Sequence, residues 1–273
     1  MTVQATMIAT PLTADFDRQY GSFLPGRWVP APRFVLRRDR ILALVGRLRP
    51  GKVIEVGCGA GSLLCDMARR GHDSTGIETS TQALEIASEL TAGLDNAAVR
   101  SSAASTWDSQ FDLLMSFDVL EHIEDDAAAL TQWVGWLKPG AAAVLSVPGH
   151  RKMWSPRDAW AGHFRRYDRK DFTDLVEQAG LRIERVECYG FPLSNLTHWL
   201  GNLSVRGQDF AGGANDTAGA TAASGTDRST HVRLFGVQRS LPGRAAMALA
   251  CLVQKLFLRT DLGDGYIIVA RKP

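Results

Sequence analysis

The chain lacks a long apolar run, a strong excess of charge of either sign and a dense set of cysteines. Its 273 residues carry a formal net charge of +2, which gives no broad positive field for gathering nucleic acid. No apolar run is long enough to span a bilayer, and the N-terminus has no basic start followed by an apolar block. We therefore expect no nucleic-acid partner, no integral membrane span and no signal peptide.

Cysteine is sparse, and its spacing excludes the common thiolate metal sites. The four cysteines are Cys58, Cys65, Cys188 and Cys251. They are scattered without metal-ligand spacing, so the sequence predicts no metal. Unpaired thiols act as small buried hydrophobes in a reducing compartment, which favours a cytoplasmic location.

A short β-branched run followed by glycines on alternate positions is the most informative segment. The run Val53–Val56 contains Glu55 and precedes Gly57, Gly59 and Gly61. The run is typical of a buried strand, and the glycines allow a tight turn that a ligand can approach closely. A strand, a glycine turn and a helix together form a nucleotide-type cradle at the carboxyl edge of a parallel sheet.

The spacing of the glycines separates the candidate nucleotides. A dinucleotide fingerprint reads Gly-x-Gly-x-x-Gly, but here Ser62 holds the third glycine position and the glycine falls one residue earlier. No P-loop lysine follows. Glu78 lies 23 residues after Glu55, near the end of a second apolar strand, where a carboxylate can accept both hydroxyls of a ribose.

Two further segments carry a family resemblance. Phe111–Ile123 reads FDLLMSFDVLEHI, and with the Glu-x-Gly-x-Gly-x-Gly loop it resembles the class I S-adenosylmethionine-dependent methyltransferases. Val147–Tyr167 contains VP, a tryptophan, an aspartate and GHFRRY, and it resembles the small-molecule branch often labelled type 11. The resemblance covers about residues 35–190, and the final strand weakly.

The resemblance implies S-adenosylmethionine as cofactor and assigns residues to it. Glu55 would support the methionine amino group, and Glu78 the ribose. The acid expected beside the adenine is missing, so Ser102 or Ala103 is the substitute contact. The expected cofactor-binding residues are Glu55, Gly57, Cys58, Gly59, Gly61, Glu78, Thr79, Ser102, Ala103, Phe117, Leu120 and His122.

Methyl transfer requires an aligned acceptor, and a base when the acceptor is a hydroxyl or a protonated amine. The catalytic candidates are His163, His122, His150 and Tyr167, with Asp158 as an orienting group. His163 is equally open to a structural role, and a packing role is favoured for His122. The expected substrate-binding residues are Tyr20, Trp28, Trp154, Trp160, Phe164 and Arg166, although a structural role is favoured for the arginine.

Strand and helix patterns alternate along the chain, which predicts a doubly wound, mostly parallel sheet with helices on both faces. The resemblance implies seven strands, with the last antiparallel. We expect an N-terminal arm and cap helices in 1–50, a Rossmann-like cofactor-binding core in 51–190, an inserted connection in 191–262 and a final strand in 263–273. The connection would hold a mobile loop at 207–230, with a lid as the alternative, and an apolar helix.

These observations predict a methyltransferase acting on an oxygen, nitrogen or carbon atom of a small organic acceptor in specialised metabolism. The sequence leaves open whether the protein forms a homodimer. The alternatives are a glycan, lipid or quinone-type acceptor and a non-catalytic cofactor-binding module. A nucleic-acid base methyltransferase is disfavoured because Asn/Asp-Pro-Pro-aromatic is absent after the fourth strand, and a nicotinamide oxidoreductase because of the glycine spacing.

Overall fold

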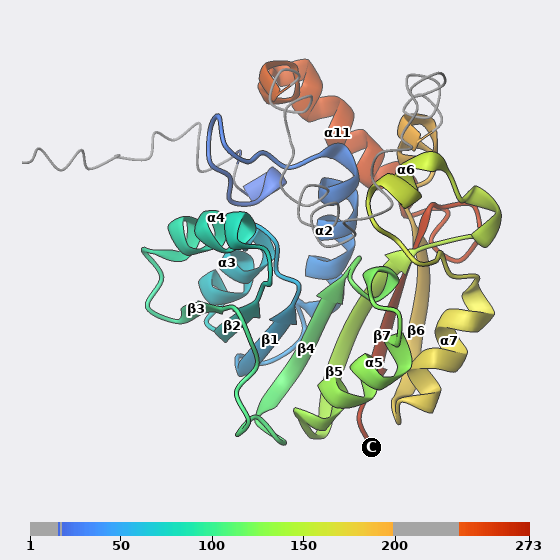
Figure 1. Ribbon diagram of the computed structural model, residues 1–273. Coiled ribbons are helices and arrows are strands. Elements are labelled where there is room, and N and C mark those ends of the chain that lie inside the picture. The colour runs from blue at the N-terminus through green and yellow to red at the C-terminus, as the bar shows by residue number, and fades with distance from the viewer. Residues whose placement is uncertain (1–15, 17, 199–234) are drawn as a thin grey trace, which may run out of the picture.

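The computed structural model describes residues 16, 18–198 and 235–273. Within them, one sheet has seven strands in the order β3-β2-β1-β4-β5-β7-β6 (Figure 1). Neighbouring strands are parallel except that β7 runs antiparallel to β5 and β6. The predicted fold class is therefore confirmed, including the antiparallel last strand.

The elements follow the predicted order closely. The strands are β1 (Lys52–Val56), β2 (Asp73–Ile77), β3 (Ala97–Arg100), β4 (Phe111–Phe117), β5 (Leu137–Pro148), β6 (Arg182–Tyr189) and β7 (Gly265–Arg271). The α-helices are α2 (Pro32–Val45), α3 (Ser62–Arg69), α4 (Thr81–Thr91), α5 (Asp126–Gly135), α6 (Pro156–Trp160), α7 (Arg169–Gln178) and α11 (Leu241–Gln254). Two 3-10 turns are η1 (Leu120–His122) and η2 (Arg151–Met153).

One strand begins earlier than the sequence predicts. The helix stop Lys138-Pro139-Gly140 predicts a fifth strand over residues 141–147, but β5 already starts at Leu137, which pairs with Phe111 of β4. Gly140 has a φ of 75°, and the register of the β4–β5 pair shifts at this point. The turn residues therefore form an irregularity inside the strand rather than its boundary.

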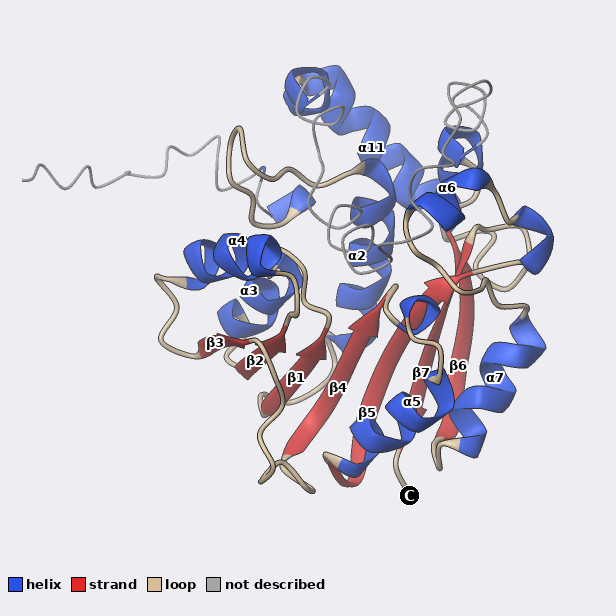
Figure 2. Cartoon of the chain, in the orientation of Figure 1, coloured by secondary structure: helices blue, strands red, loops and turns tan. Residues whose placement is uncertain are grey.

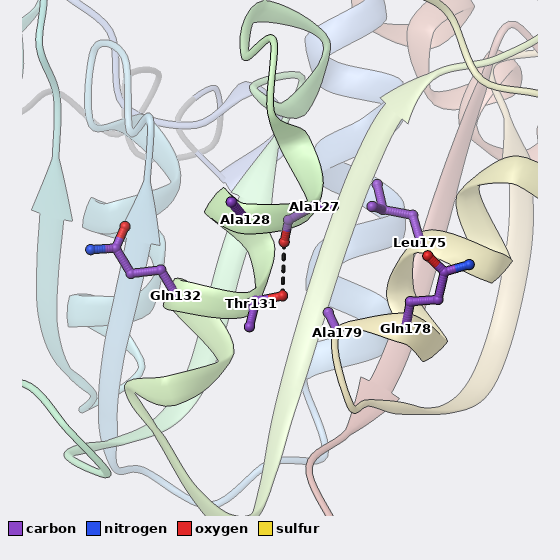
Figure 3. Close-up of a pocket in the computed structure, with 7 residues that line it drawn as sticks. All are labelled: Ala127, Ala128, Thr131, Gln132, Leu175, Gln178 and Ala179. Carbon is purple, nitrogen blue, oxygen red and sulfur yellow. Dashed lines mark hydrogen bonds between the residues drawn. The ribbon is translucent and has the colours of Figure 1, made fainter.

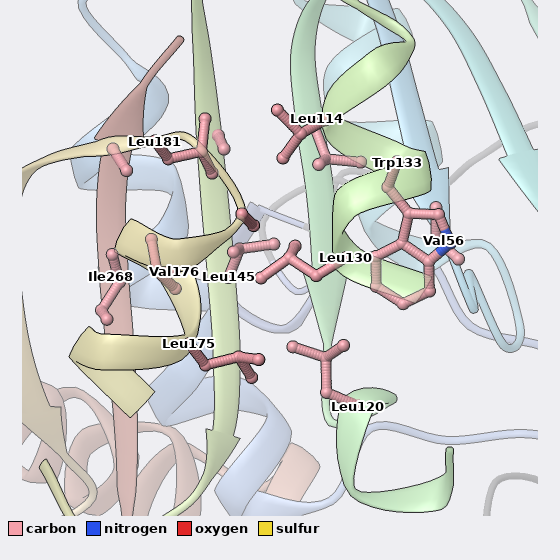
Figure 4. Packing of buried hydrophobic residues seen from close by; sticks show 14 of the residues in the cluster. Val56, Leu114, Leu120, Leu130, Trp133, Leu145, Leu175, Val176, Leu181 and Ile268 are labelled. Atoms are coloured by element: carbon pink, nitrogen blue, oxygen red, sulfur yellow. The ribbon is translucent and has the colours of Figure 1, made fainter. Parts of the chain in front are cut away.

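Helices cover both faces of the sheet (Figure 2). On one face, α5 contributes Leu130 and Trp133 and α7 contributes Leu175, and they pack on Leu114 and Leu145 of the sheet (Figure 4). On the other face, α2 and α3 pack on the alternate side chains of β1, β4, β5 and β7. Central strands buried on both sides explain the near-continuous apolar runs in the sequence.

Helix α11 is attached to the sheet layer through α2. The Gln254 side chain is fully buried, donates to the Leu36 carbonyl oxygen at 3.0 Å and accepts from the Gly190 amide at 3.2 Å. Helix α11 thus joins α2 to the end of β6.

The predicted loop at 207–230 lies outside the described residues, and the predicted domain boundaries stay a prediction. No helix in the described ranges has both the length and the apolarity to cross a bilayer.

Candidate functional site

A cavity of about 1450 Å³ lies at the carboxyl ends of β1, β2 and β4. The strand order reverses between β1 and β4, and open α/β sheets bind ligands at this switch point. The walls come from the loop after β1, from α2, from η1 and from the α6 segment. Single-ligand pockets usually measure about 300–1,000 Å³, so this cavity has room for more than one small molecule.

The glycine loop forms one end of the cavity. Gly57 has a φ of 67° and Gly59 a φ of 53°, both in the left-handed region that favours glycine. A Cβ atom at Gly57 would lie 2.3 Å from Val119 Cγ2, so a side chain there would displace the segment after β4. A Cβ at Gly59 would meet nothing within 4 Å, which leaves bare backbone open to a ligand.

Glu78, just past the end of β2, holds the glycine loop in place. Its Oε2 accepts a hydrogen bond from the Gly59 amide at 2.9 Å, and its Oε1 accepts from the Ser80 amide at 2.8 Å. A carboxylate offers about four acceptor positions, so two remain for a ligand. The residue lines the cavity and can accept from a diol while it fixes the loop.

Glu55 lies on β1 under the glycine loop and is 3% exposed. Its Oε2 has no hydrogen-bond partner among the described residues. Burial raises the pKa of this carboxyl to about 8, although Arg37 acts in the opposite direction. A buried acceptor without a partner that lines a cavity is suited to a cationic hydrogen-bond donor supplied by a ligand.

Two arginines of α2 reach the end of β4 across the cavity. Arg33 and Arg37 both form ion pairs with Asp118, and Arg33 Nε also lies 3.1 Å from Asp264 Oδ2. Asp118 has a φ of 56°, and its amide donates to the Ser146 carbonyl oxygen at 2.9 Å. Burial opposes ionisation of Asp118, but the two arginines outweigh it and lower the pKa of its carboxyl.

The opposite end of the cavity contains a histidine oriented by an aspartate. His163 Nδ1 lies 3.1 Å from Asp158 Oδ1, which also accepts from Arg166 Nη1 at 3.0 Å. Asp158 Oδ2 accepts from the Ser155 amide at 2.8 Å, which closes the capping box of α6. Burial works against the charged form, but His163 and Arg166 prevail and lower the pKa of the Asp158 carboxyl.

A second histidine and a buried glutamate lie beside this pair. The ring centroids of His122 and His163 are 4.7 Å apart, and the two rings meet edge to face. Burial, with His163 as a second cause, lowers the pKa of His122 to about 4, so its ring is neutral at physiological pH. Glu121 is fully buried, and burial, with Asp118 as a second cause, raises the pKa of its carboxyl well above the ordinary value.

A smaller hollow of about 550 Å³ lies between α5 and α7 (Figure 3). Its lining residues are Ala127, Ala128, Thr131, Gln132, Leu175, Gln178 and Ala179. None of them titrates near neutral pH, and the Thr131 hydroxyl already donates to the Ala127 carbonyl oxygen at 2.8 Å. The hollow therefore offers no acid, base or nucleophile.

The sequence profile described as a methyltransferase domain matches residues 31–186. This span includes β1 to β5, the glycine loop and the α6 segment. The chain belongs to the class I S-adenosylmethionine-dependent methyltransferases, in the type 11-like branch. The resemblance predicted from the motifs is confirmed, and the cofactor of this family is S-adenosylmethionine.

Curated relatives of this methyltransferase are ubiquinone biosynthesis O-methyltransferases. The protein from Sinorhizobium medicae is 30% identical over 214 residues, which cover 67% of this chain and 84% of the relative. The protein from Alkalilimnicola ehrlichii is 33% identical over 118 residues, which cover 41% of this chain and 47% of the relative. The protein from Psychrobacter cryohalolentis is 40% identical over 104 residues, covering 35% and 40%. Over the strongest matches, the chain spans about half the length of these relatives.

Solved structures show the same fold at low sequence identity. A putative sarcosine dimethylglycine methyltransferase from Galdieria sulphuraria has a TM-score of 0.57 at 17% identity, covering 96% of this chain and 98% of its own. The [4+2]-cyclase SpnF has a TM-score of 0.55 at 20% identity, covering 96% and 92%. Because a cyclase shares this architecture, the chemistry of the methyltransferase must be argued from its site.

The residues at the glycine end fit the family's cofactor. The unpaired Glu55 oxygen suits the ammonium of the methionine part, and Glu78 retains acceptor positions for the ribose hydroxyls. The open backbone at Gly59 allows close approach. The predicted cofactor residues that line the cavity are Glu55, Gly57, Cys58, Gly59, Glu78, Thr79, Phe117 and His122.

Four predicted cofactor residues lie outside the cavity lining. Gly61 takes the left-handed N-cap position of α3 with a φ of 75°. Leu120 is 1% exposed and packs in the core beside α5. Ser102 and Ala103 are exposed after β3. The roles predicted for these residues stay predictions, and the cavity instead presents Ser80, the N-cap of α4, with Thr81 and Gln82 from the first turn of that helix.

Some of the predicted catalytic and substrate-binding residues line the cavity, and the others lie elsewhere. Among them, His163, His122, Trp28, Trp160, Phe164 and Arg166 line the cavity. Tyr20 stacks on Phe16 in a separate core cluster, and Trp154 is 44% exposed outside the lining. His150 is buried against Tyr266, and Tyr167 donates its hydroxyl hydrogen to Asp126 Oδ2 at 2.6 Å.

Several cavity residues were missed by the sequence analysis. Arg33 and Arg37 are four positions apart on α2, so both face the same side, and that spacing was the available signal. Glu121 was quoted inside the family motif without a role. Asp264 precedes the last strand, and no local pattern connects it to residues more than 200 positions away.

Proposed function

We propose that this methyltransferase transfers the methyl group of S-adenosylmethionine to a hydroxyl oxygen of a small aromatic acceptor of the quinone or quinol type. The names of the curated relatives, ubiquinone biosynthesis O-methyltransferases, support this acceptor class over the specialised-metabolism substrate expected first. The predicted cytoplasmic location and homodimer stay predictions.

The observation that carries the proposal is one continuous cavity with two chemically different ends. Glu55, Glu78 and the glycine loop line the cofactor end, and the Asp158–His163 pair lines the other. Orienting two reactants in one cavity can contribute about 7–11 kcal/mol toward the barrier. The cofactor supplies an electrophilic methyl group when it is bound.

The acceptor end suits an aromatic hydroxyl. Trp160 and Phe164 line this end from the α6 segment, and Phe34 lines the cavity from α2. Flat apolar side chains of this kind bind an aromatic ring by stacking and burial. Because a phenol must lose its proton as the oxygen attacks, the Asp158–His163 pair is the group that we expect to promote this loss.

The test incubates the purified chain with S-adenosylmethionine and matched catechol, phenol, aniline and thiophenol acceptors. Mass spectrometry of the products should show the gain of one methyl group on the hydroxyl acceptors, and S-adenosylhomocysteine should form in equal amount. Methylation of the amine alone, or binding of NADH in preference to S-adenosylmethionine in a calorimeter, would contradict the proposal.

A further inference from the structure

One wall of the cavity is polar and lies near β6 and β7, on the side of the sheet away from the glycine loop. Three of its residues come from the helical stretch 193–198 that follows β6. Ser194, Thr197 and His198 are three and four positions apart, so they share one face of that turn, and all three line the cavity. Asp264, directly before β7, completes this polar wall.

Two oxygens of the polar wall are buried without a partner. Asp264 is 3% exposed and Ser194 is 1% exposed. Asp264 Oδ1 and Ser194 Oγ form no hydrogen bond with any residue that the structure describes. Both oxygens lie beside Gly190, where an added Cβ atom would be 2.6 Å from Oδ1 and 3.0 Å from Oγ. Burying a polar atom without a partner is unfavourable, and a ligand that supplies the missing hydrogen bonds removes that cost.

The negative charge of Asp264 is already balanced. Arg33 Nε lies 3.1 Å from Asp264 Oδ2. Asp118, the other partner of Arg33, also forms an ion pair with Arg37, so two arginines face two carboxylates. Asp264 Oδ1 therefore lacks a hydrogen-bond donor rather than a counter-ion, and an uncharged donor is sufficient.

The other groups of the polar wall are neutral. Burial, with Arg166 as a second cause, lowers the pKa of His198, so its ring is neutral at physiological pH. The Thr197 hydroxyl already donates to the Ser194 carbonyl oxygen at 2.9 Å, whereas the Ser194 hydroxyl is free to donate or accept. A ligand hydroxyl, which is uncharged and both donates and accepts, matches this set better than an ammonium or a carboxylate.

Arg166 connects the polar wall to the Asp158–His163 pair. Its Nη1 donates to Asp158 Oδ1 at 3.0 Å, and its Nη2 donates to the Asp264 carbonyl oxygen at 3.0 Å. One buried guanidinium group thus spans the distance between the two positions. A single small acceptor can therefore present one hydroxyl to His163 and a second hydroxyl to the polar wall.

We propose that the polar wall binds a second hydroxyl of the acceptor, which is not methylated and lies a few bonds from the reacting oxygen. Asp264 Oδ1 accepts the hydrogen of this group, and the Ser194 hydroxyl donates to its oxygen. The inference rests on the proposed function and narrows its substrate class to aromatic acceptors with a hydroxyl-bearing substituent. A site built to bind a hydroxyl rejects an analogue without it, because the analogue leaves polar groups unpaired.

The test compares two catechols that carry either a hydroxyethyl or a propyl substituent at the same ring position, so that a hydroxyl replaces a methyl group. Calorimetry measures the Kd of each compound for the full chain saturated with S-adenosylhomocysteine. We expect the hydroxyethyl compound to bind about tenfold more tightly or better, because a hydrogen bond to a charged acceptor has an effect of this size.

Ser194→Ala should reduce this preference about fivefold, and Asp264→Asn about tenfold, since a neutral amide is a weaker acceptor than a carboxylate. Ser62→Ala is the matched control. Ser62 is also buried, its hydroxyl has no partner among the described residues, and it lines the cavity beside the glycine loop, so the preference should persist. Thermal melting curves confirm folding, and Ser194→Ala decides alone if Asp264→Asn does not fold.

The inference is overturned if the wild-type chain binds neither catechol, binds both equally or prefers the propyl compound. It is also overturned if Ser194→Ala retains the full wild-type preference. Methylation of both catechols without a difference in affinity would overturn the inference and leave the proposed function intact. Tighter binding of the hydroxyethyl compound without methyl transfer to either catechol would overturn the proposed function instead.

Discussion

Asp158 holds the His163 ring through an Oδ1–Nδ1 contact of 3.1 Å, and the same oxygen accepts from Arg166 at 3.0 Å. The aspartate is anchored in turn by the Ser155 amide at the start of α6. A histidine fixed in this way presents its second nitrogen in one direction. The orientation of this ring is therefore determined by the loop between β5 and α7.

Replacing His163 should impair turnover and leave cofactor binding unchanged. In His163→Gln we expect kcat to fall by about 100-fold or more, because assisted proton loss contributes roughly 10²–10⁴-fold. The affinity for S-adenosylmethionine, measured by calorimetry, should stay within error of the wild type. His150→Gln is the comparison: this buried histidine lies outside the cavity lining, so it should lower Tm more than kcat. Full activity in His163→Gln would make the residue structural.

Replacing Glu78 should weaken cofactor binding. Glu78→Ala removes a charged acceptor that contacts two backbone amides of the site. Loss of hydrogen bonds to a charged group costs about 1.5–3 kcal/mol, so we expect the Kd for S-adenosylmethionine to rise by roughly 10–150-fold. Glu85→Ala, an exposed change on the adjacent helix α4, serves as the control. Equal affinities in the two variants would remove Glu78 from the site.

Glu55 should make the cofactor-free protein less stable as the pH rises. Its folded-state pKa of about 8 lies above the ordinary value of 4.5, so the folded state retains the proton more strongly. The stabilisation is present in full below pH 4.5 and is lost as the pH rises through about 8, with an upper limit on the order of 4–5 kcal/mol. Urea unfolding of wild type and Glu55→Gln between pH 5 and 8.5 measures the difference, and parallel curves would contradict the assignment.

The same carboxyl should release a proton when the cofactor binds. An ammonium group beside Glu55 favours the ionised form, so the folded-state pKa of Glu55 should fall on binding. Calorimetric titrations at pH 7 in buffers of different ionisation enthalpy should show release of up to one proton per cofactor. Glu55→Gln should abolish this release, and an unchanged buffer dependence would exclude Glu55 as its source.

The buried pair between Arg38 and Asp66 should contribute strongly to stability. Arg38 Nε and Nη2 donate to the two Asp66 oxygens at 2.5 and 2.6 Å, and both side chains are nearly inaccessible. Arg38→Leu leaves the buried Asp66 carboxylate with only Arg70, whose Nη1 lies 3.9 Å from Oδ1, and losing the close partner of a buried charge costs about 3–5 kcal/mol. Urea denaturation should show this loss, and Arg38→Leu/Asp66→Leu should recover much of it. The exposed pair of Lys170 and Asp174 offers the contrast, since Lys170→Ala should leave the midpoint unchanged.

Much of the fold could be predicted because its signals are local. The run Val53–Val56, the following glycines and the segment from Phe111 each mark a buried strand and the turn after it, and both strands lie at the centre of the sheet. The predicted start of β5 was wrong because Pro139 and Gly140 mark turns in most proteins. Here, pairing with β4 extends the strand across both residues.

The site was harder to predict because its contacts join distant parts of the chain. Glu55 and Glu78 follow the motif, and both line the cavity. Arg33 meets Asp118 across 85 positions, and Phe164 binds the Glu121 backbone across more than 40. Single-sequence patterns carry no information on such pairs, so the arginines were missed and Tyr20 was assigned to the substrate.

The α2 arginines also determine where the protein can be divided. Arg33 and Arg37 precede the boundary predicted at residue 51, yet they supply the positive charge opposite Asp118 and Asp264. A fragment that begins at that boundary would retain every glycine of the loop after β1. It would lack both arginines, so Asp118 and Asp264 would lose these ion-pair partners. The smallest autonomous catalytic unit must therefore include the helix that precedes the first strand.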